Sequence, residues 1–126
     1  MILGSGIDLV EVARVERELA RRGGDGFGDL FTEVERIRCG RCNRPAVAYA
    51  RGFAAKEACF KAIGTGKVGR MSWLDIEVDD AGGRPAVSLT GETAEAAKHA
   101  GVTAVHLSFT RTGGQVLAWA VTEGTR

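Results

Sequence analysis

The chain has 126 residues, of which 44% are hydrophobic and 26% are charged, and its formal net charge is +1 at pH 7. This composition is typical of an ordinary globular protein, and the length predicts a single domain over residues 1–126 with little room for a second core. The near-neutral charge gives no global argument for a nucleic acid or a membrane as a partner, and no apolar run approaches the roughly 20 residues that span a bilayer.

The first third of the chain predicts one strand and two helices. Residues 2–7 form a short apolar run that is typical of a buried strand. Asp8 can then begin a helix that extends to about Arg22, because Asp8 and Glu11 have the spacing of a capping box. A second helix is expected at 29–38. Its expected apolar face consists of Leu30, Phe31, Val34 and Ile37.

The longest predicted element is a helix that begins after Asn43 and ends at Gly64. Pro45 suits its first turn, where a missing N–H has no helical partner, and Gly64 suits a C-terminal position with positive φ. Glu57 and Lys61 are one turn apart, and the ordinary interpretation of such a pair is an exposed helix-stabilising contact. The aromatic residues expected on the buried face are Tyr49, Phe53 and Phe60.

The second half of the chain predicts four strands, at residues 73–78, 85–89, 102–110 and 115–122. The first two strands form a hairpin around a turn at 79–83, and the last two meet at a glycine turn. Between these pairs, Thr90 can cap an alanine-rich helix at 92–100 that Gly101 closes. The expected fold class is therefore α+β, with an antiparallel sheet packed on a long central helix.

The beginning of the chain and its cysteines bear on the compartment. Residues 1–10 contain an acid and no basic segment, so they do not resemble a signal peptide. Three cysteines in a chain without an export signal are expected to be reduced thiols in the cytoplasm. Cys39 and Cys42 have the spacing of half a zinc knuckle, but no second pair completes four ligands, so two incidental thiols are the default interpretation.

Two segments, separated in the sequence, are similar to those of a known enzyme family. They are G-I-D-L-V-E at 6–11 and F-A-A-K-E-A-C-F-K-A-I-G-T-G at 53–66. On these segments the chain resembles the holo-acyl-carrier-protein synthases, which are small 4′-phosphopantetheinyl transferases. The resemblance implies the fold of these transferases, and transfer of the phosphopantetheine arm of coenzyme A to a serine of an apo acyl carrier protein, with release of 3′,5′-ADP. It also implies a homotrimer with an active site at each subunit junction.

The resemblance also implies catalytic residues. Asp8 and Glu57 match the metal ligands of the family, and Lys61 matches a lysine that reaches the phosphates. Mg²⁺ suits such a displacement, because it typically takes one or two carboxylates together with phosphate oxygens. The serine proton would go to a metal-bound water or to Glu57. Spacing alone does not show that the two acids meet, so the capping box and the exposed helix pair remain alternatives.

Contacts with coenzyme A are expected at the end of the central helix and on the strand at 102–110. Glycines in the segment Gly64-Thr65-Gly66 allow close backbone approach to a nucleotide, although the same residues also suit a plain C-cap. His106 and Ser108 occupy a segment similar to the H-V-S/T segment of the family. The alternative for a single strand histidine is a purely structural role.

Arginines give the remaining expected contacts with coenzyme A. The resemblance implies such contacts from Arg44 and Arg51, but Arg51 precedes by one residue the position, here Gly52, where the family commonly has Arg. Arg111 stands where relatives often have His or Asp, and its guanidinium could supply a replacement phosphate contact. Because of these departures, the alternative function is a non-catalytic module of the same fold that binds coenzyme A or a nucleotide.

A basic line on the first helix is the expected docking surface for the carrier protein. Arg14, Arg17 and Arg21 recur at helical spacing, and carrier proteins present acidic helices whose opposite charge would guide association. The alternative is a solvated helix face balanced by Glu16 and Glu18. The sequence leaves open whether the acceptor serves fatty-acid or polyketide synthesis. A basic-helix interaction protein without catalysis is a third possible function.

Overall fold

The computed structural model describes residues 1–80 and 83–125, so the predicted turn at 79–83 lies partly outside the described residues. Its elements in chain order are β1 (Ile2–Glu11), α1 (Val12–Arg22), α2 (Glu33–Gly40), α3 (Pro45–Ile63), β2 (Ile76–Asp79), β3 (Ala86–Leu89), α4 (Gly91–His99), β4 (Val102–Thr112) and β5 (Gln115–Gly124), with short 3-10 turns at Gly24–Phe27 and Trp73–Asp75. Of the described helices, none is long and apolar enough to cross a membrane.

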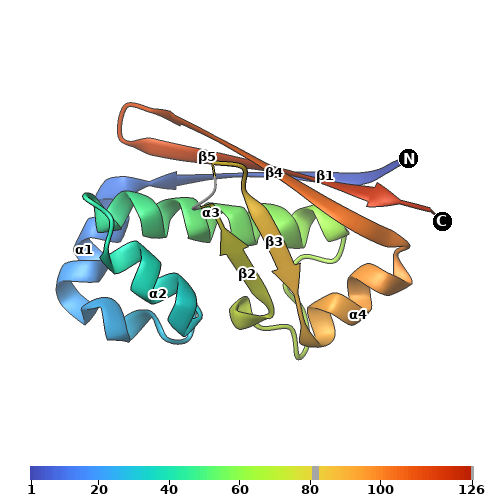
Figure 1. The fold of residues 1–126 in the computed structure, drawn as a ribbon, viewed down its shortest axis with the longest axis horizontal. Coiled ribbons are helices and arrows are strands. Elements are labelled where there is room, and N and C mark those ends of the chain that lie inside the picture. The colour runs from blue at the N-terminus through green and yellow to red at the C-terminus, as the bar shows by residue number, and fades with distance from the viewer. Residues whose placement is uncertain (81–82, 126) are drawn as a thin grey trace.

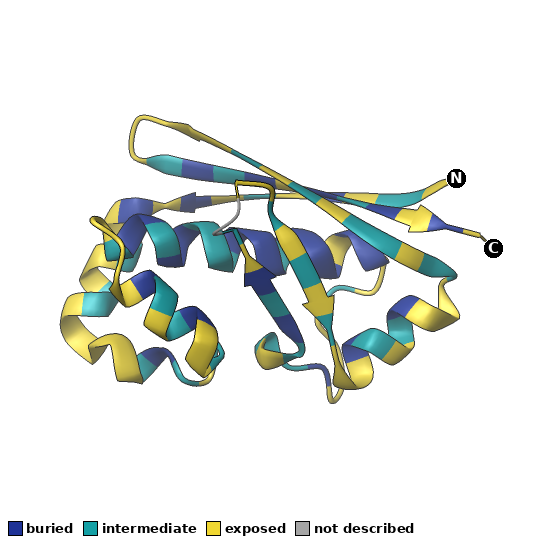
Figure 2. Ribbon diagram, in the orientation of Figure 1, coloured by how far each residue is buried: buried dark blue, intermediate teal, exposed yellow. Residues whose placement is uncertain are grey.

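The predicted α+β architecture is confirmed. β1, β5 and β4 form an antiparallel three-stranded sheet in that order, while β2 and β3 pair as a separate antiparallel hairpin. α3 lies along one face of the larger sheet, with α1 and α2 near its beginning and the hairpin and α4 further along (Figure 1). The side chains of α3 are buried along most of its length, whereas the opposite face of the sheet is largely exposed (Figure 2).

Small residues set the distance between the central helix and the sheet. α3 begins at Pro45 and ends before Gly64, whose φ is 101°, as the sequence predicted. Ala58 is fully buried, and a Cβ placed on Gly6 of β1 would lie 2.3 Å from the Ala58 carbonyl oxygen. Glycine at position 6 is therefore required for β1 to lie directly against α3. Of the aromatic residues predicted to be buried, Tyr49 and Phe60 are buried, and Phe53 is partly so.

β1 is longer than predicted, and the capping box is wrong. The strand continues to Glu11, and Asp8 pairs with Ala118 of β5 in the antiparallel ladder. α1 begins only at Val12, and its N-cap residue Glu11 makes no side-chain capping hydrogen bond. Because strand side chains alternate between faces, Gly6, Asp8 and Val10 all point toward α3. A strand in place of the first helical turn is thus what directs the Asp8 carboxylate inward.

The predicted apolar face of the second helix is only half confirmed, because Phe31 is buried and Leu30 packs beside it, but both residues precede the helix. α2 begins at Glu33, because Thr32 and Glu35 form a capping box in which each side chain bonds the other residue's backbone N–H. Val34 and Ile37 are consequently exposed, at 59% and 47%. The side chain of Glu35 turns inward in their place.

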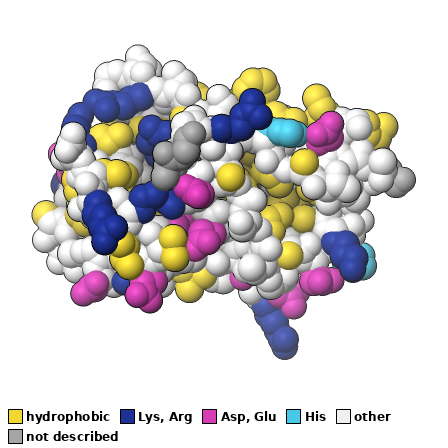
Figure 3. Space-filling view, in the orientation of Figure 1, with side chains coloured by type: hydrophobic (Ala, Val, Ile, Leu, Met, Phe, Trp, Pro, Cys, Tyr) yellow, Lys and Arg dark blue, Asp and Glu magenta, His cyan; other side chains and the backbone are white. Residues whose placement is uncertain are grey.

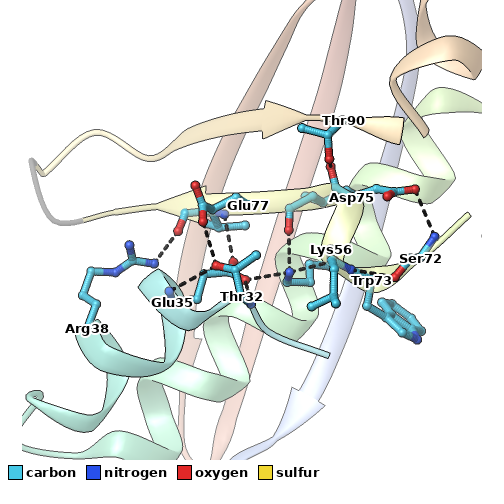
Figure 4. A network of polar contacts seen from close by, with 12 residues as sticks. Thr32, Glu35, Arg38, Lys56, Ser72, Trp73, Asp75, Glu77 and Thr90 are labelled. Carbon is cyan, nitrogen blue, oxygen red and sulfur yellow. Dashed lines mark hydrogen bonds and ion pairs between the residues drawn. The ribbon is translucent and has the colours of Figure 1, made fainter. Parts of the chain in front are cut away.

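Glu35 belongs to a buried polar network that the sequence did not indicate (Figure 4). The Lys56 ammonium group is fully buried and donates to Glu35 Oε1 at 2.8 Å, to the Trp73 carbonyl at 2.8 Å and to the Ile76 carbonyl. Glu35 Oε2 accepts the backbone N–H of Val78 at 2.9 Å. The network therefore ties α3 to the beginning of α2 and to β2, and every donor of the ammonium group has an acceptor.

Candidate active site

The structure brings Asp8, Glu57 and Lys61 together between β1 and α3. Lys61 Nζ donates to the Ile7 carbonyl at 3.0 Å and lies 3.3 Å from Asp8 Oδ1. Glu57 is one turn earlier on the same helix, where it is partly buried. Lys61 thus contacts β1. Its hydrogen bonds are to Ile7 and Asp8 and not to Glu57, so the alternative of a simple exposed Glu57–Lys61 pair on the helix does not hold.

Three effects act on the pKa of the Glu57 carboxyl group. Burial has the largest effect and raises this pKa. The negative charge of Asp8 raises it further, while the positive charge of Lys61 lowers it. The two carboxylates are therefore close enough to repel each other, and a cation between them would relieve the repulsion. Within the described residues, no group of three or more His, Cys, Asp and Glu is placed to hold a metal. Two carboxylates fit Mg²⁺, which completes its shell with substrate oxygens and waters.

Asp8 and Glu57 line a cavity of about 740 Å³. Its walls include the aromatic side chains of Phe27, Phe31 and Phe53. α1 contributes Arg14 and Arg21 from the predicted docking line, whereas Arg17 does not line the cavity. Asp8, Glu57 and two of the three arginines of the predicted docking line therefore face one cavity.

The three arginines of the predicted docking line differ in their contacts. Arg21 Nη2 bonds Glu18 Oε2 at 2.8 Å, and this bond is the largest influence that lowers the pKa of Glu18. Arg14 and Arg17 make no ion pair within residues 1–80 and 83–125. Arg21 is thus balanced by Glu18, as in the alternative interpretation of this helix face. The charges of Arg14 and Arg17 are not balanced by an ion pair within the described residues.

A second cavity, of about 290 Å³, lies where α2, the beginning of α3 and β2 meet, and Arg44 and Arg51 line it. Arg51 is one of several arginines there, the others being Arg38, Arg44 and Arg111. A Cβ on Gly52 would lie 2.9 Å from Phe31 Cε1, so the Phe31 ring occupies the space that a longer side chain at position 52 would need.

The segment Gly64-Thr65-Gly66 has the geometry of a helix C-cap. The N–H of Gly64 donates to the Lys61 carbonyl at 3.0 Å, and the N–H of Gly66 donates to the Phe60 carbonyl at 3.2 Å. Both glycines have positive φ. Their two N–H groups are thus used within the helix end, which supports the plain C-cap interpretation and leaves the Thr65 hydroxyl, bonded to the Gly66 carbonyl, as the polar side chain there.

His106 and Ser108 lie on the open face of the sheet, away from Asp8. Along β4 the odd-numbered residues from Val105 to Phe109 pack on the core, so the even-numbered residues point outward. His106 Nε2 lies 3.0 Å from Glu123 Oε1. Ser108 pairs with Trp119 of β5, which is 49% exposed. The described structure therefore does not bring His106 and Ser108 to Asp8 and Glu57 within one subunit.

The sequence profile of the 4′-phosphopantetheinyl transferase superfamily matches residues 4–120. The chain belongs to this superfamily. It is 44% identical over 128 residues to a holo-[acyl-carrier-protein] synthase of Anaeromyxobacter dehalogenans, an alignment that covers 99% of the chain and 98% of the relative. The resemblance seen in the two sequence segments is thus confirmed.

Solved structures of similar transferases share the fold. A holo-[acyl-carrier-protein] synthase from Neisseria meningitidis has a TM-score of 0.86 at 33% identity and covers 98% of this chain and 99% of its own. One from Bacillus anthracis, in complex with coenzyme A (3′,5′-ADP), has a TM-score of 0.77 at 34% identity and covers 99% of both chains. This phosphopantetheinyl transferase accordingly uses coenzyme A and modifies an acyl carrier protein.

Sequence reasoning missed several residues that shape the two cavities of the transferase. Phe27 and Phe31 wall the larger cavity, and Arg38 and Asp80 line the smaller one. Lys56 stands inside the recognised F-A-A-K-E segment, yet it is a buried structural residue. A lysine within an otherwise apolar helix face was the available signal, because such a side chain is rarely buried without a partner.

Proposed function

We propose that the chain is a Mg²⁺-dependent holo-[acyl-carrier-protein] synthase in which Asp8, Glu57 and Lys61 form the reaction centre, with 3′,5′-ADP as the leaving group. The observation that supports this proposal best is that two neighbouring carboxylates line one cavity and that the ammonium group of Lys61 contacts one of them. Asp8 and Glu57 would hold the metal. When bound, Mg²⁺ would supply positive charge to the pyrophosphate oxygens of coenzyme A.

The side chains of the chain have distinct tasks in this proposal. Lys61, held by Asp8 and by the Ile7 carbonyl, would neutralise a phosphate oxygen as charge moves to the leaving group. Glu57, which lines the cavity, would accept the proton of the incoming serine. The cavity beside them is open to the acceptor serine.

The substrates would approach from different sides. The 3′-phosphate of coenzyme A, which is separate from the reacting pyrophosphate, would lie near Arg44 and Arg51, with the helix end at 64–66 beside the nucleotide. The carrier protein would dock on Arg14, Arg17 and Arg21, two of which face the larger cavity. The three free cysteines suit a reducing cytoplasm as the compartment.

The proposed homotrimer accounts for the open face of the sheet. Ile7, Leu9 and Trp119 are 53%, 50% and 49% exposed, and all three point away from α3. A face of this kind is expected to be covered in an assembly. If a neighbouring subunit covers it, His106 and Ser108 lie at the junction, where they can complete the site of the neighbour.

Mass spectrometry of the carrier protein tests the proposed function. Apo acyl carrier protein is incubated with coenzyme A, MgCl₂ and the enzyme, and the carrier is weighed. We expect the mass of one phosphopantetheine group to be added by the wild type and almost none by Asp8→Asn or Glu57→Gln. Binding of coenzyme A without modification would instead indicate the non-catalytic module, and neither binding nor modification would indicate the interaction protein.

A further inference from the structure

A carboxylate lies among the arginines of the smaller cavity. Arg51 Nη2 is 3.0 Å from Asp80 Oδ2, and Arg38 Nε is 3.6 Å from Asp80 Oδ1. The side chain of Asp80 is 26% exposed, and it lines the same cavity as both arginines. A single carboxylate of this chain thus contacts two guanidinium groups that lie where we propose the 3′-phosphate of coenzyme A to bind.

The cavity remains basic despite Asp80. Four arginines line it, and its other acid, Glu35, already accepts bonds from Lys56, Thr32 and Val78. Arg111 makes no ion pair among the residues that the structure describes. Basic side chains gather over the part of the surface where α2 and the beginning of α3 lie (Figure 3). An excess of guanidinium groups favours a multiply charged anion, for which phosphates are the usual ligands.

Arg51 is held in place but incompletely paired. Its guanidinium carbon lies 4.6 Å from the centre of the Phe109 ring, a cation–π contact that fixes the plane of the group. Its Nε is buried and has no hydrogen-bond partner among the described residues. Asp80 therefore satisfies only part of the hydrogen-bonding capacity of Arg51, and a phosphate can reach the guanidinium because the side chain is 39% exposed, although it cannot reach the buried Nε.

We propose that the Asp80 carboxylate pairs with Arg51 and Arg38 in the free enzyme, and that the 3′-phosphate of coenzyme A displaces it from these guanidinium groups when it binds. Asp80 thereby sets the affinity for coenzyme A by competition. This inference rests on the proposed function, because it requires the 3′-phosphate to bind at Arg44 and Arg51. The contact is partly exposed, so its loss is expected to change affinity modestly rather than by orders of magnitude.

Calorimetric titration of the full chain with coenzyme A and with adenosine 3′,5′-bisphosphate tests the inference. Asp80→Asn keeps the shape of the side chain and removes its charge, and we expect both ligands to bind roughly two- to fivefold more tightly. The KM for coenzyme A should fall while the KM for the carrier protein stays the same. Glu95→Gln on α4 removes one negative charge outside the cavity and should leave both affinities near the wild-type values.

Arginine variants separate failure of the inference from failure of the proposed function. Arg44→Ala and Arg51→Ala should weaken coenzyme A binding, and in the Arg51→Ala background the effect of Asp80→Asn should shrink. Unchanged affinity in both arginine variants would overturn the proposed phosphate position together with the inference. Weakened binding in these variants without tighter binding in Asp80→Asn would overturn the inference alone. Asp80→Ala repeats the test should Asp80→Asn fold poorly.

Discussion

Glu57 is partly buried beside Asp8, and both burial and that charge raise its pKa. A carboxyl group whose pKa is higher in the folded state stabilises the fold below its unfolded pKa, and this contribution is lost as pH rises through the folded pKa. We therefore expect Glu57→Gln to raise the Tm of the metal-free protein at pH 8, with a gain that shrinks as the pH falls toward 4. Calorimetry across this range measures it, and a lower Tm at pH 8 would contradict the expected electrostatics.

The same two carboxylates predict how the protein responds to Mg²⁺. A ligand that binds the folded state and not the unfolded state raises the Tm by an amount that grows with the logarithm of its concentration relative to its Kd. We expect MgCl₂ to raise the Tm of the wild type but not that of Asp8→Asn or Glu57→Gln. Glu95→Gln, on α4, should respond like the wild type. Equal stabilisation of all four proteins would show that Asp8 and Glu57 do not hold the ion.

The sequence indicated Asp8, Glu57 and Lys61 as candidate site residues, but it could not predict the backbone conformation at Asp8. A capping box and a continuing strand both fit the residues around it, because Asp8 and Glu11 have the capping-box spacing while Leu9 and Val10 can extend the preceding apolar run. What decides is the pairing of Asp8 with Ala118, more than a hundred positions away along the chain. Long-range pairing of this kind has no local pattern, and it is what directs the carboxylate toward Lys61.

At the scale of elements, the Lys56–Glu35 pair holds α2 and β2 on α3. Burial lowers the pKa of Lys56, while the charge of Glu35 opposes that shift. Removing one partner leaves the other buried and uncompensated, so Lys56→Met should lower the free energy of unfolding by about 3–5 kcal/mol. The double variant Lys56→Met/Glu35→Gln should be more stable than the single variant, as urea unfolding would measure. Purely additive losses would contradict a coupled pair.

The helices show which local signals in the sequence are enough to predict where a helix begins and ends. Pro45 and Gly64 fixed both ends of α3 in the sequence-based prediction, because each acts through its own backbone. The boundary of α2 was wrong, because the Thr32–Glu35 capping box outweighed the apolar spacing of Val34 and Ile37. Glu35 can turn inward only because Lys56, on another helix, meets it there. That compensation across elements is not visible within either segment.

The arginines of α1 are predicted to bind the carrier protein, and reversing their charge tests this. Arg14 makes no ion pair in the described structure, and Arg14 and Arg21 both face the larger cavity. Reversing both charges (Arg14→Glu, Arg21→Glu) should raise the KM for the carrier roughly five- to tenfold through slower association, while sparing the KM for coenzyme A. Lys98→Glu on α4 is the matched control and should change neither. Similar increases in both KM values would count against docking on α1.

At the scale of the whole molecule, the sheet separates two groups of expected site residues. Asp8 points toward α3, whereas His106 points to the open face of the same sheet. One subunit therefore cannot bring both side chains to one ligand without disrupting the sheet. The sequence could predict both residues through family resemblance, but it could not show that they face opposite ways, because this follows from the register of β1 and β4 on β5.

A site shared between subunits predicts complementation. Asp8→Asn and His106→Ala should each be nearly inactive alone, since every junction in such a trimer lacks one of the two groups. In randomly mixed trimers, about one quarter of the junctions would combine an intact Asp8 with an intact His106 from the neighbouring subunit. We therefore expect activity to return when the two proteins are co-expressed and purified together. Trp119→Asp, placed on the exposed sheet face, should yield monomers by light scattering and abolish this recovery. Activity that stays at the average of the two separate variants would mean that each subunit contains a complete site.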